Sequence, residues 1–481
     1  MPQGIAAGDV TPHRAVIWSR TDRPARVVVE YSSTEKFENP LRRVGPAALE
    51  PSDFTARVIL TELPAGQRIF YRVTFQDLSD LKTSSVPQTG SFRTPEPANP
   101  RRDITIVWSA DTVGQGWGLN TEWGGLRMYD TMRRVEPDVF INCGDTIYAD
   151  QIVLPAVKLD DGSVWRNAVT ESKSKVAETL DEYRGNYKYN LLDEHMRRFN
   201  AEVPQIVLWD DHEVRDNWYE TRDLSQDDRY KVKSVAMLAA RARKAFFEFN
   251  PIAPAADEAD RVYRTVSLGP LVDVFAMDLR SYRGANSENR QTSMTPDSRI
   301  LGSDQLAALK TRLAESRATW KVMACDMPIG LIVRDGGTLF EAVANADPGA
   351  PLGRELEFAD LLKFIRDRRI QNIVWITGDV HYCAAHHYDP SRATFTEFNP
   401  FWEFVAGPLH AGTFGPAALD RTFGPEVRFI GIPKGMKGNR PPSDGLQFFG
   451  MMRVNARTRQ MTVTLRNVAG DILYDVNLDP A

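Results

Sequence analysis

The sequence has 481 residues, of which 42% are hydrophobic and 26% are charged, and this composition excludes a disordered chain. Its 64 acidic and 59 basic residues give a net charge of -5, which excludes a surface built mainly to bind nucleic-acid backbones. No segment approaches about 18 consecutive apolar residues, so we expect no transmembrane segment. The three cysteines, Cys143, Cys325 and Cys383, each lie in an apolar run, which indicates buried free thiols.

Residues 1–95 contain short alternating runs separated by turns, a pattern typical of a small β-sandwich. The segment LPAGQRIFYRV suits an immunoglobulin-like or fibronectin-like domain. PEPANPRR then interrupts all periodicity, as an interdomain linker does. The predicted strands are RAVIWSR, RVVVEYS, TARVILTEL, QRIFYRVTF and GSFRT.

Residues 96–481 alternate buried strands with amphipathic helices, which predicts an α/β architecture. The predicted helices include LRMYDTMRRV, VKSVAMLAARARKAFFEF and SDQLAALKTRLAESR. After about Thr394 the chain returns to a β pattern, with residues 451–478 as a hairpin or meander, and we assign this part to the same domain. The predicted strands, each ending in polar or acidic residues, are ITIVWSAD, DVFINCGD, QIVLWDDHE, LVDVFAMDL, WKVMACDMP and NIVWITGD.

Four of these strand ends carry candidate metal ligands. The first ends at Asp111, and the second continues as GDTIYAD, with Asp145 and Tyr148. A single aspartate after a strand also suits a turn or a helix cap. Open α/β sheets, however, place ligands outside the carboxyl ends of their strands, so we expect these side chains to converge.

The third and fourth strand ends are denser in charge. WDDHEVRDNW places Asp211, His212, Arg215 and Asn217 directly after a buried run, where so much charge is costly unless ions or partners satisfy it. In GDVHY, Asp379 and His381 are two residues apart, so both can face one site. Together the four motifs predict a multi-metal centre that can bind a phosphoryl group and activate hydroxide.

These motifs resemble the alkaline phosphatase D (PhoD-like) branch of the calcineurin-like metallophosphoesterase superfamily. The resemblance rests on IAAGDVTPHRAVIWSR, GDTIYAD, WDDHEVRDNW and GDVHY and extends over nearly the whole chain. It implies a four-layer αββα catalytic sandwich in residues 96–481, behind an immunoglobulin-like β-sandwich in residues 1–95. It also implies hydrolysis of phosphate esters.

The resemblance also implies the role of each candidate residue. Asp145 is expected to bridge metals, Tyr148 to bind iron(III), and Asp379 and His381 to complete the centre. The remaining expected metal ligands are Asp111, Asp211 and Asn217, and the expected catalytic residues are His212, Asp211 and Arg215.

The expected metals are iron(III) and calcium. Known members of the branch place cysteine where this chain has Asp111, and a carboxylate favours harder ions than a thiolate does. Another divalent metal pair is therefore an open alternative. Asp326, at a further strand end, has no assigned role.

The function expected from this resemblance is that of a phosphomonoesterase in which metal-activated hydroxide attacks phosphorus. A phosphodiesterase or phospholipase D-type hydrolase is the alternative, and a non-catalytic binding protein is a remote one. We expect a phosphate ester as substrate and no specific nucleic-acid partner. A periplasmic or secreted location is expected, with the export signal absent from this sequence, and the sequence carries no signal for the oligomeric state.

Overall fold

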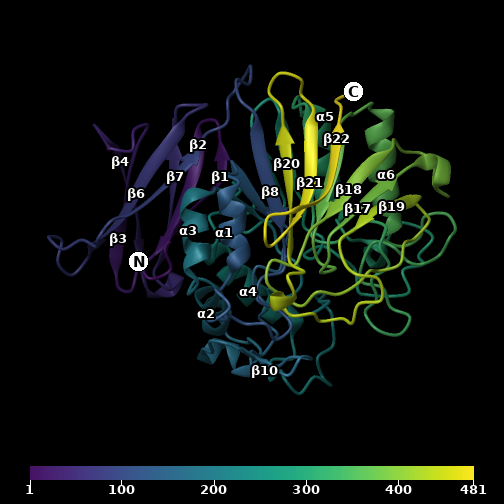
Figure 1. Cartoon of the computed structure of the whole chain (residues 1–481), viewed down its shortest axis with the longest axis horizontal. Coiled ribbons are helices and arrows are strands. Elements are labelled where there is room, and N and C mark those ends of the chain that lie inside the picture. Colours follow the sequence, from purple (N-terminus) through teal and green to yellow (C-terminus); the bar gives the residue numbers. More distant parts are fainter.

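The computed structural model describes residues 1–481 and begins with seven strands in two small sheets (Figure 1). Buried side chains from both sheets, among them Ile17, Val29, Leu60 and Tyr71, form one core. The immunoglobulin-like class of this sandwich and its boundary at residue 95 stay predictions. One sheet contains β1 (Ile5–Thr11), β2 (Arg14–Arg20) and β5 (Thr55–Thr61), and the other contains β4 (Leu41–Ala48), β3 (Ala25–Ser32), β6 (Arg68–Asp77) and β7 (Gln88–Arg93).

The first sheet of the sandwich continues into the large sheet of the following residues. β1 pairs in parallel with β12 through Gly8 and Gln205, which produces a nine-stranded sheet in the order β22-β21-β20-β8-β9-β12-β1-β2-β5. Asp9 reinforces the junction, because its carboxylate lies 2.8 Å from Arg264. The other strands are β8 (Ile104–Ser109), β9 (Val139–Asn142), β12 (Gln205–Val207), β20 (Phe448–Val454), β21 (Met461–Asn467) and β22 (Ile472–Leu478).

A second sheet of seven strands lies beside the first, and its central strands are parallel. Its order is β13-β14-β15-β16-β18-β17-β19. The strands of the final β pattern belong to the nine-stranded sheet, since β20 pairs with β8. The strands are β13 (Arg264–Ser267), β14 (Val272–Ala276), β15 (Trp320–Ala324), β16 (Ile373–Thr377), β17 (Ala384–Tyr388), β18 (Phe401–Val405) and β19 (Pro425–Ile430).

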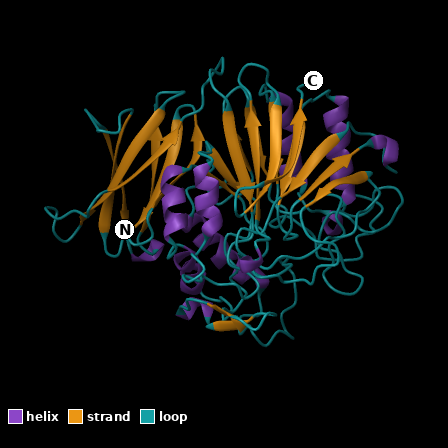
Figure 2. Cartoon of the chain, in the orientation of Figure 1, coloured by secondary structure: helices purple, strands orange, loops and turns teal.

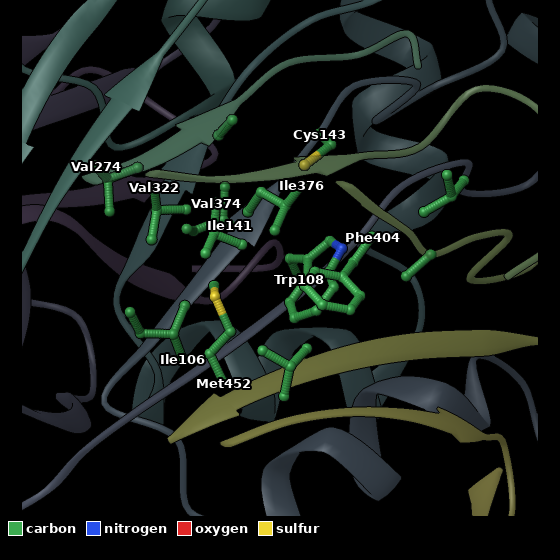
Figure 3. Close-up of a cluster of buried hydrophobic side chains, with 14 of the residues drawn as sticks. Ile106, Trp108, Ile141, Cys143, Val274, Val322, Val374, Ile376, Phe404 and Met452 are labelled. Atoms are coloured by element: carbon green, nitrogen blue, oxygen red, sulfur yellow. The ribbon is translucent and has the colours of Figure 1, made fainter. Parts of the chain in front are cut away.

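The main core lies between the two large sheets, and side-chain alternation explains it. In β8, Ile106 and Trp108 enter this core while Val107 faces the opposite side; in β16, Val374 enters it while Trp375 faces away. Figure 3 shows this cluster with side chains from both sheets.

Helices cover the outward faces of both sheets. Side chains of α1 and α3 pack with Val107 and Phe140, and side chains of α5 and α6 pack with Met323 and Trp375. The helices are α1 (Arg127–Arg134), α2 (Leu180–Asn190), α3 (Glu194–Glu202), α4 (Val235–Phe249), α5 (Ser303–Glu315) and α6 (Glu355–Asp367). The expected mixed α/β architecture is therefore confirmed.

Sequence features explain where helices α2 and α4 begin. Thr179 and Glu182 form a capping box at the start of α2, and the Ser234 hydroxyl accepts a hydrogen bond from Met237 N at the start of α4. A small antiparallel hairpin of β10 (Ala156–Lys158) and β11 (Val164–Arg166) precedes α2 in the chain. Short 3-10 helices are η1 (Glu50–Ser52), η2 (Glu171–Lys173), η3 (Pro296–Ser298), η4 (Pro390–Arg392) and η5 (Pro442–Asp444).

Long loops gather along one edge of the strands, as Figure 2 shows. Strands β8, β9 and β12 run parallel to one another, and so do β15, β16 and β18, so their carboxyl ends bring several of these loops together. No helix of the structure combines the length and the apolar character that crossing a bilayer requires.

Candidate metal centre

Most of the candidate ligands occupy a rare backbone conformation in the loops that follow the strands. Left-handed backbone is uncommon for residues other than glycine, and such residues cluster at functional sites because the strain must be stabilised by their surroundings. Five of the predicted ligands share it: Asp111 (φ 66°), Asp145 (φ 52°), Asn217 (φ 55°), Asp379 (φ 66°) and His381 (φ 60°).

Two glycines make these turns sterically accessible. Gly144 has φ 113°, and a Cβ placed there would lie 2.5 Å from the Cβ of Asp210. A Cβ at Gly378 would lie 2.3 Å from the Cβ of Ala110. Both motifs therefore require glycine before the aspartate, which explains GD at the ends of β9 and β16.

The first ligand group contains Asp111, Asp145 and His381, whose potential ligand atoms lie within 4.8 Å of one another. His381 Nδ1 lies 2.6 Å from the carbonyl oxygen of Gly412 and donates a hydrogen bond to it, so Nε2 carries the free lone pair. The Tyr148 hydroxyl lies 2.9 Å from that Nε2. Oxygen and imidazole donors therefore converge at this point.

Asp111 provides the test of whether this group fits a cation. Its side chain is 0% exposed, and neither carboxylate oxygen has a hydrogen-bond partner. Burial raises the pKa of Asp111 well above its usual range, and burial does the same for Asp145. Buried carboxylates without donors are costly, and a cation among them removes this cost. The residues therefore fit a bound metal ion.

The second ligand group contains Asp145, Asp211 and His212, again within 4.8 Å. Asp145 is common to both groups, which is the arrangement expected of a bridging carboxylate. Asn217 lies beside this group, because its backbone N–H donates to Asp211 Oδ2 at 2.5 Å. Burial opposes ionisation of Asp211, but His212 and Arg280 hold its pKa at about 2.

His212 has a fixed orientation. Its Nδ1 lies 2.8 Å from Asp150 Oδ1, and its ring stacks on Tyr148 with a centroid distance of 4.2 Å. Burial alone lowers the pKa of His212, but Asp150, Asp211 and Asp145 raise it well above its usual value. Asp150 ends the GDTIYAD motif, but that motif alone does not indicate this contact with His212.

A buried arginine that the sequence analysis missed lies behind the ligands. Arg280 is 0% exposed, and its guanidinium contacts Asp210 at 2.5 Å, Asp326 at 3.3 Å and Glu341 at 2.5 Å. It also lies 3.6 Å from Asp379. The signal that identifies Arg280 is its position soon after β14, because it follows a buried strand as the acidic ligands do.

Asp379 and Asp326 thus differ from the other strand-end carboxylates. Asp379 lines the cleft but belongs to neither group of converging ligand atoms. Asp326 is fully buried against Arg280, and burial raises its pKa to about 6. Asp326 therefore belongs to the cluster of carboxylates around Arg280 and to neither ligand group.

The ligands open into a cleft of about 390 Å³. Asp145, Asp211, His212, Asn217 and His381 line it, together with Asp379. The structure does not bring the predicted catalytic Arg215 to this cleft. Its guanidinium is directed at the Asp227 carboxylate, 3.9 Å away, whereas Arg334, from the loop after β15, lines the cleft.

Two family models match most of this chain. Residues 106–465 match the model of the PhoD-like phosphatase family, and residues 1–96 match that of its N-terminal domain. Alkaline phosphatase D of Bacillus subtilis (strain 168) is 25% identical over 441 residues, which cover 86% of this chain and 70% of that protein.

Two solved structures share the fold. A structure of PhoD has a TM-score of 0.72 at 19% identity and covers 99% of this chain and 88% of its own. The purple acid phosphatase PPD1 of yellow lupin (Lupinus luteus) has a TM-score of 0.59 at 12% identity, covering 99% of this chain and 73% of its own.

Proposed function

Because the chain belongs to the PhoD-like phosphatase family, we propose that it hydrolyses phosphomonoesters as an alkaline phosphatase does. As a member of that family, the protein is a metal-dependent phosphoesterase. The observation that carries the proposal is that Asp145 belongs to two ligand groups at once, which supports a pair of neighbouring cations beside an open cleft.

The ligand chemistry supports a hard metal pair. The first group, with Asp111, Asp145, His381 and the Tyr148 hydroxyl, offers the oxygen-rich set that suits iron(III). Asp211 and Asn217 beside the second group add oxygens that suit calcium. These residues would hold two cations, which would neutralise phosphate charge and make water a better nucleophile.

Among the chain's own residues, His212 is our proposed proton donor to the leaving oxygen. Asp150 holds Nδ1, and in this proposal Nε2 faces the substrate and binds no metal ion, so that Asp145, Asp211 and Asn217 would hold the second cation; His212 also lines the cleft. The stacked Tyr148 ring prevents the imidazole from turning away. Asp150 is therefore a positioning residue in this proposal, and His212 is the catalytic one.

The test compares kcat/KM for p-nitrophenyl phosphate and bis(p-nitrophenyl) phosphate at alkaline pH, before and after chelation. We expect the monoester to be preferred and chelation to abolish both rates. Preference for the diester would instead identify a phosphodiesterase. Failure of the fully metallated protein to cleave either ester would contradict the proposed function.

A further inference from the structure

The cleft has an apolar wall in addition to the metal ligands. We define this wall by Ile332, Val333, Val380, Tyr382, Phe414 and Pro416, all of which line the cleft. Ile332 and Val333 come from the loop after β15, and Phe414 packs against the His381 ring at a centroid distance of 5.6 Å. Apolar surface therefore reaches the edge of the first ligand group. A site that contacted only the phosphate group of its substrate would not need such a surface.

Arg334 is the single lysine or arginine among the residues that line the cleft. Its guanidinium lies 4.5 Å from the centre of the Phe340 ring, and no carboxylate lies within ion-pair distance of it. Arg222, by contrast, is paired with Asp335 at 2.6 Å. The charge of Arg334 is therefore available to an anion in the cleft.

The loop that carries Arg334 is fixed to the metal centre through the next residue. The Asp335 carboxylate accepts hydrogen bonds from Asn217 Nδ2 at 3.2 Å, Arg222 Nη1 at 2.6 Å and Asn286 Nδ2 at 2.9 Å. Because Asn217 is a candidate metal ligand, this contact places the backbone of Arg334 beside the second ligand group. The base of the loop is held, while the Arg334 side chain is exposed and can reach a ligand.

We propose that this cleft selects phosphomonoesters of apolar alcohols, with Arg334 binding phosphate oxygens and the apolar wall receiving the organic group. The inference rests on the proposed function and adds to it the class of substrate. At alkaline pH a monoester is a dianion and a diester a monoanion, so a guanidinium favours the monoester. Its planar donors also match phosphate oxygens in pairs.

The charge half of the proposal is tested with Arg334→Gln and Arg334→Lys. For p-nitrophenyl phosphate we expect Arg334→Gln to lower kcat/KM at least about tenfold, mainly through KM, because a charge-assisted contact is lost. For bis(p-nitrophenyl) phosphate we expect a fall of no more than about threefold, since one charge fewer is involved. Lysine should restore part of the loss.

Arg457→Gln is the matched control. Arg457 is exposed in the turn between β20 and β21, and the end of β20 pairs with the start of β8, at the edge opposite Asp111. This variant changes the net charge by the same amount and should leave both rates unchanged. An equal effect of Arg334→Gln on the two esters would overturn the proposal that Arg334 favours the monoester by binding its phosphate oxygens.

The apolar half is tested with 3-phenylpropyl phosphate and propyl phosphate, whose leaving alcohols have similar chemistry. We expect kcat/KM to favour the phenylpropyl ester by roughly tenfold in the wild-type enzyme, and Val333→Ser to reduce that ratio. A wild-type ratio near unity would overturn this half. These outcomes are ratios of kcat/KM between two substrates, so they can be measured only in an active enzyme. An enzyme that hydrolyses no ester would instead contradict the proposed function itself.

Discussion

Replacing Asp111 with asparagine should affect the metal-free and metal-loaded proteins in opposite directions. In the metal-free fold the carboxylate is fully buried without a hydrogen-bond partner, and burial raises its pKa well above the unfolded value. Such a group destabilises the fold increasingly as pH rises from the unfolded pKa toward the folded one. Asparagine is neutral and of similar size, so the metal-free variant should be more stable at pH 9 by about 2 kcal/mol.

The metal-loaded protein should lose stability through the same substitution, because an anionic ligand disappears. A ligand that binds only the folded state at a hundred times its Kd stabilises that state by about 2.7 kcal/mol, and weaker binding forfeits this contribution. The measurement is urea unfolding of chelated and reconstituted protein at pH 5 and pH 9. Asp53→Asn is the control: the Asp53 carboxylate is paired with Arg20 at 2.7 Å and Lys188 at 2.9 Å, and although burial raises its pKa these partners bring it below its usual value, so its loss should destabilise both forms. A shift of the same sign in both forms of Asp111→Asn would refute the reasoning.

Three further predictions concern single side chains. Tyr148→Phe removes the hydroxyl 2.9 Å from His381 Nε2 while keeping the ring. We expect kcat/KM to fall at least about tenfold and the iron-loaded protein to lose its visible absorption. A variant that keeps both the rate and the absorption would contradict the role of Tyr148 as an iron ligand. His212→Asn should slow the hydrolysis of phenyl phosphate more than that of p-nitrophenyl phosphate, by up to about a hundredfold, because the poorer leaving group needs the proton. Equal losses of rate for the two esters would argue against His212 as a general acid. Burial lowers the pKa of Lys173 from 10.5 to about 7, so between these pH values the unfolded chain binds more protons than the folded one. The free energy of unfolding should therefore rise with pH in this range, by up to about 1.4 kcal/mol per pH unit. Lys173→Met should abolish this rise in urea titrations at several pH values.

The convergence of most candidate ligands could be predicted from the ends of the strands. Asp111, Asp145 and His381 converge as the ends of parallel strands must, and WDDHE supplies Asp211 and His212 to the same place. These positions were predictable because each charged residue follows a buried strand, and the carboxyl ends of parallel strands lie at the same edge of a sheet. Their individual roles in binding metal and substrate stay predictions.

The contributions of long loops were not predictable. Arg215 belongs to the most charged motif, yet its guanidinium faces Asp227, while Arg334 reaches the cleft from a segment without any periodic pattern. Arg280 was missed because a single arginine after a strand resembles an ordinary surface residue. The continuation of β1 into the large sheet through Gly8 and Gln205 was missed as well, since pairing between distant segments leaves no local signal.

The central claim, that Asp145 is shared by two cation sites, is tested most directly by elemental analysis of purified variants. We expect two metal ions per chain in the wild-type protein, loss of one in His381→Ala and of the other in Asp211→Ala, and loss of both in Asp145→Ala. Circular dichroism of each variant serves as the folding control. A folded Asp145→Ala protein that keeps either ion at wild-type occupancy would contradict the claim.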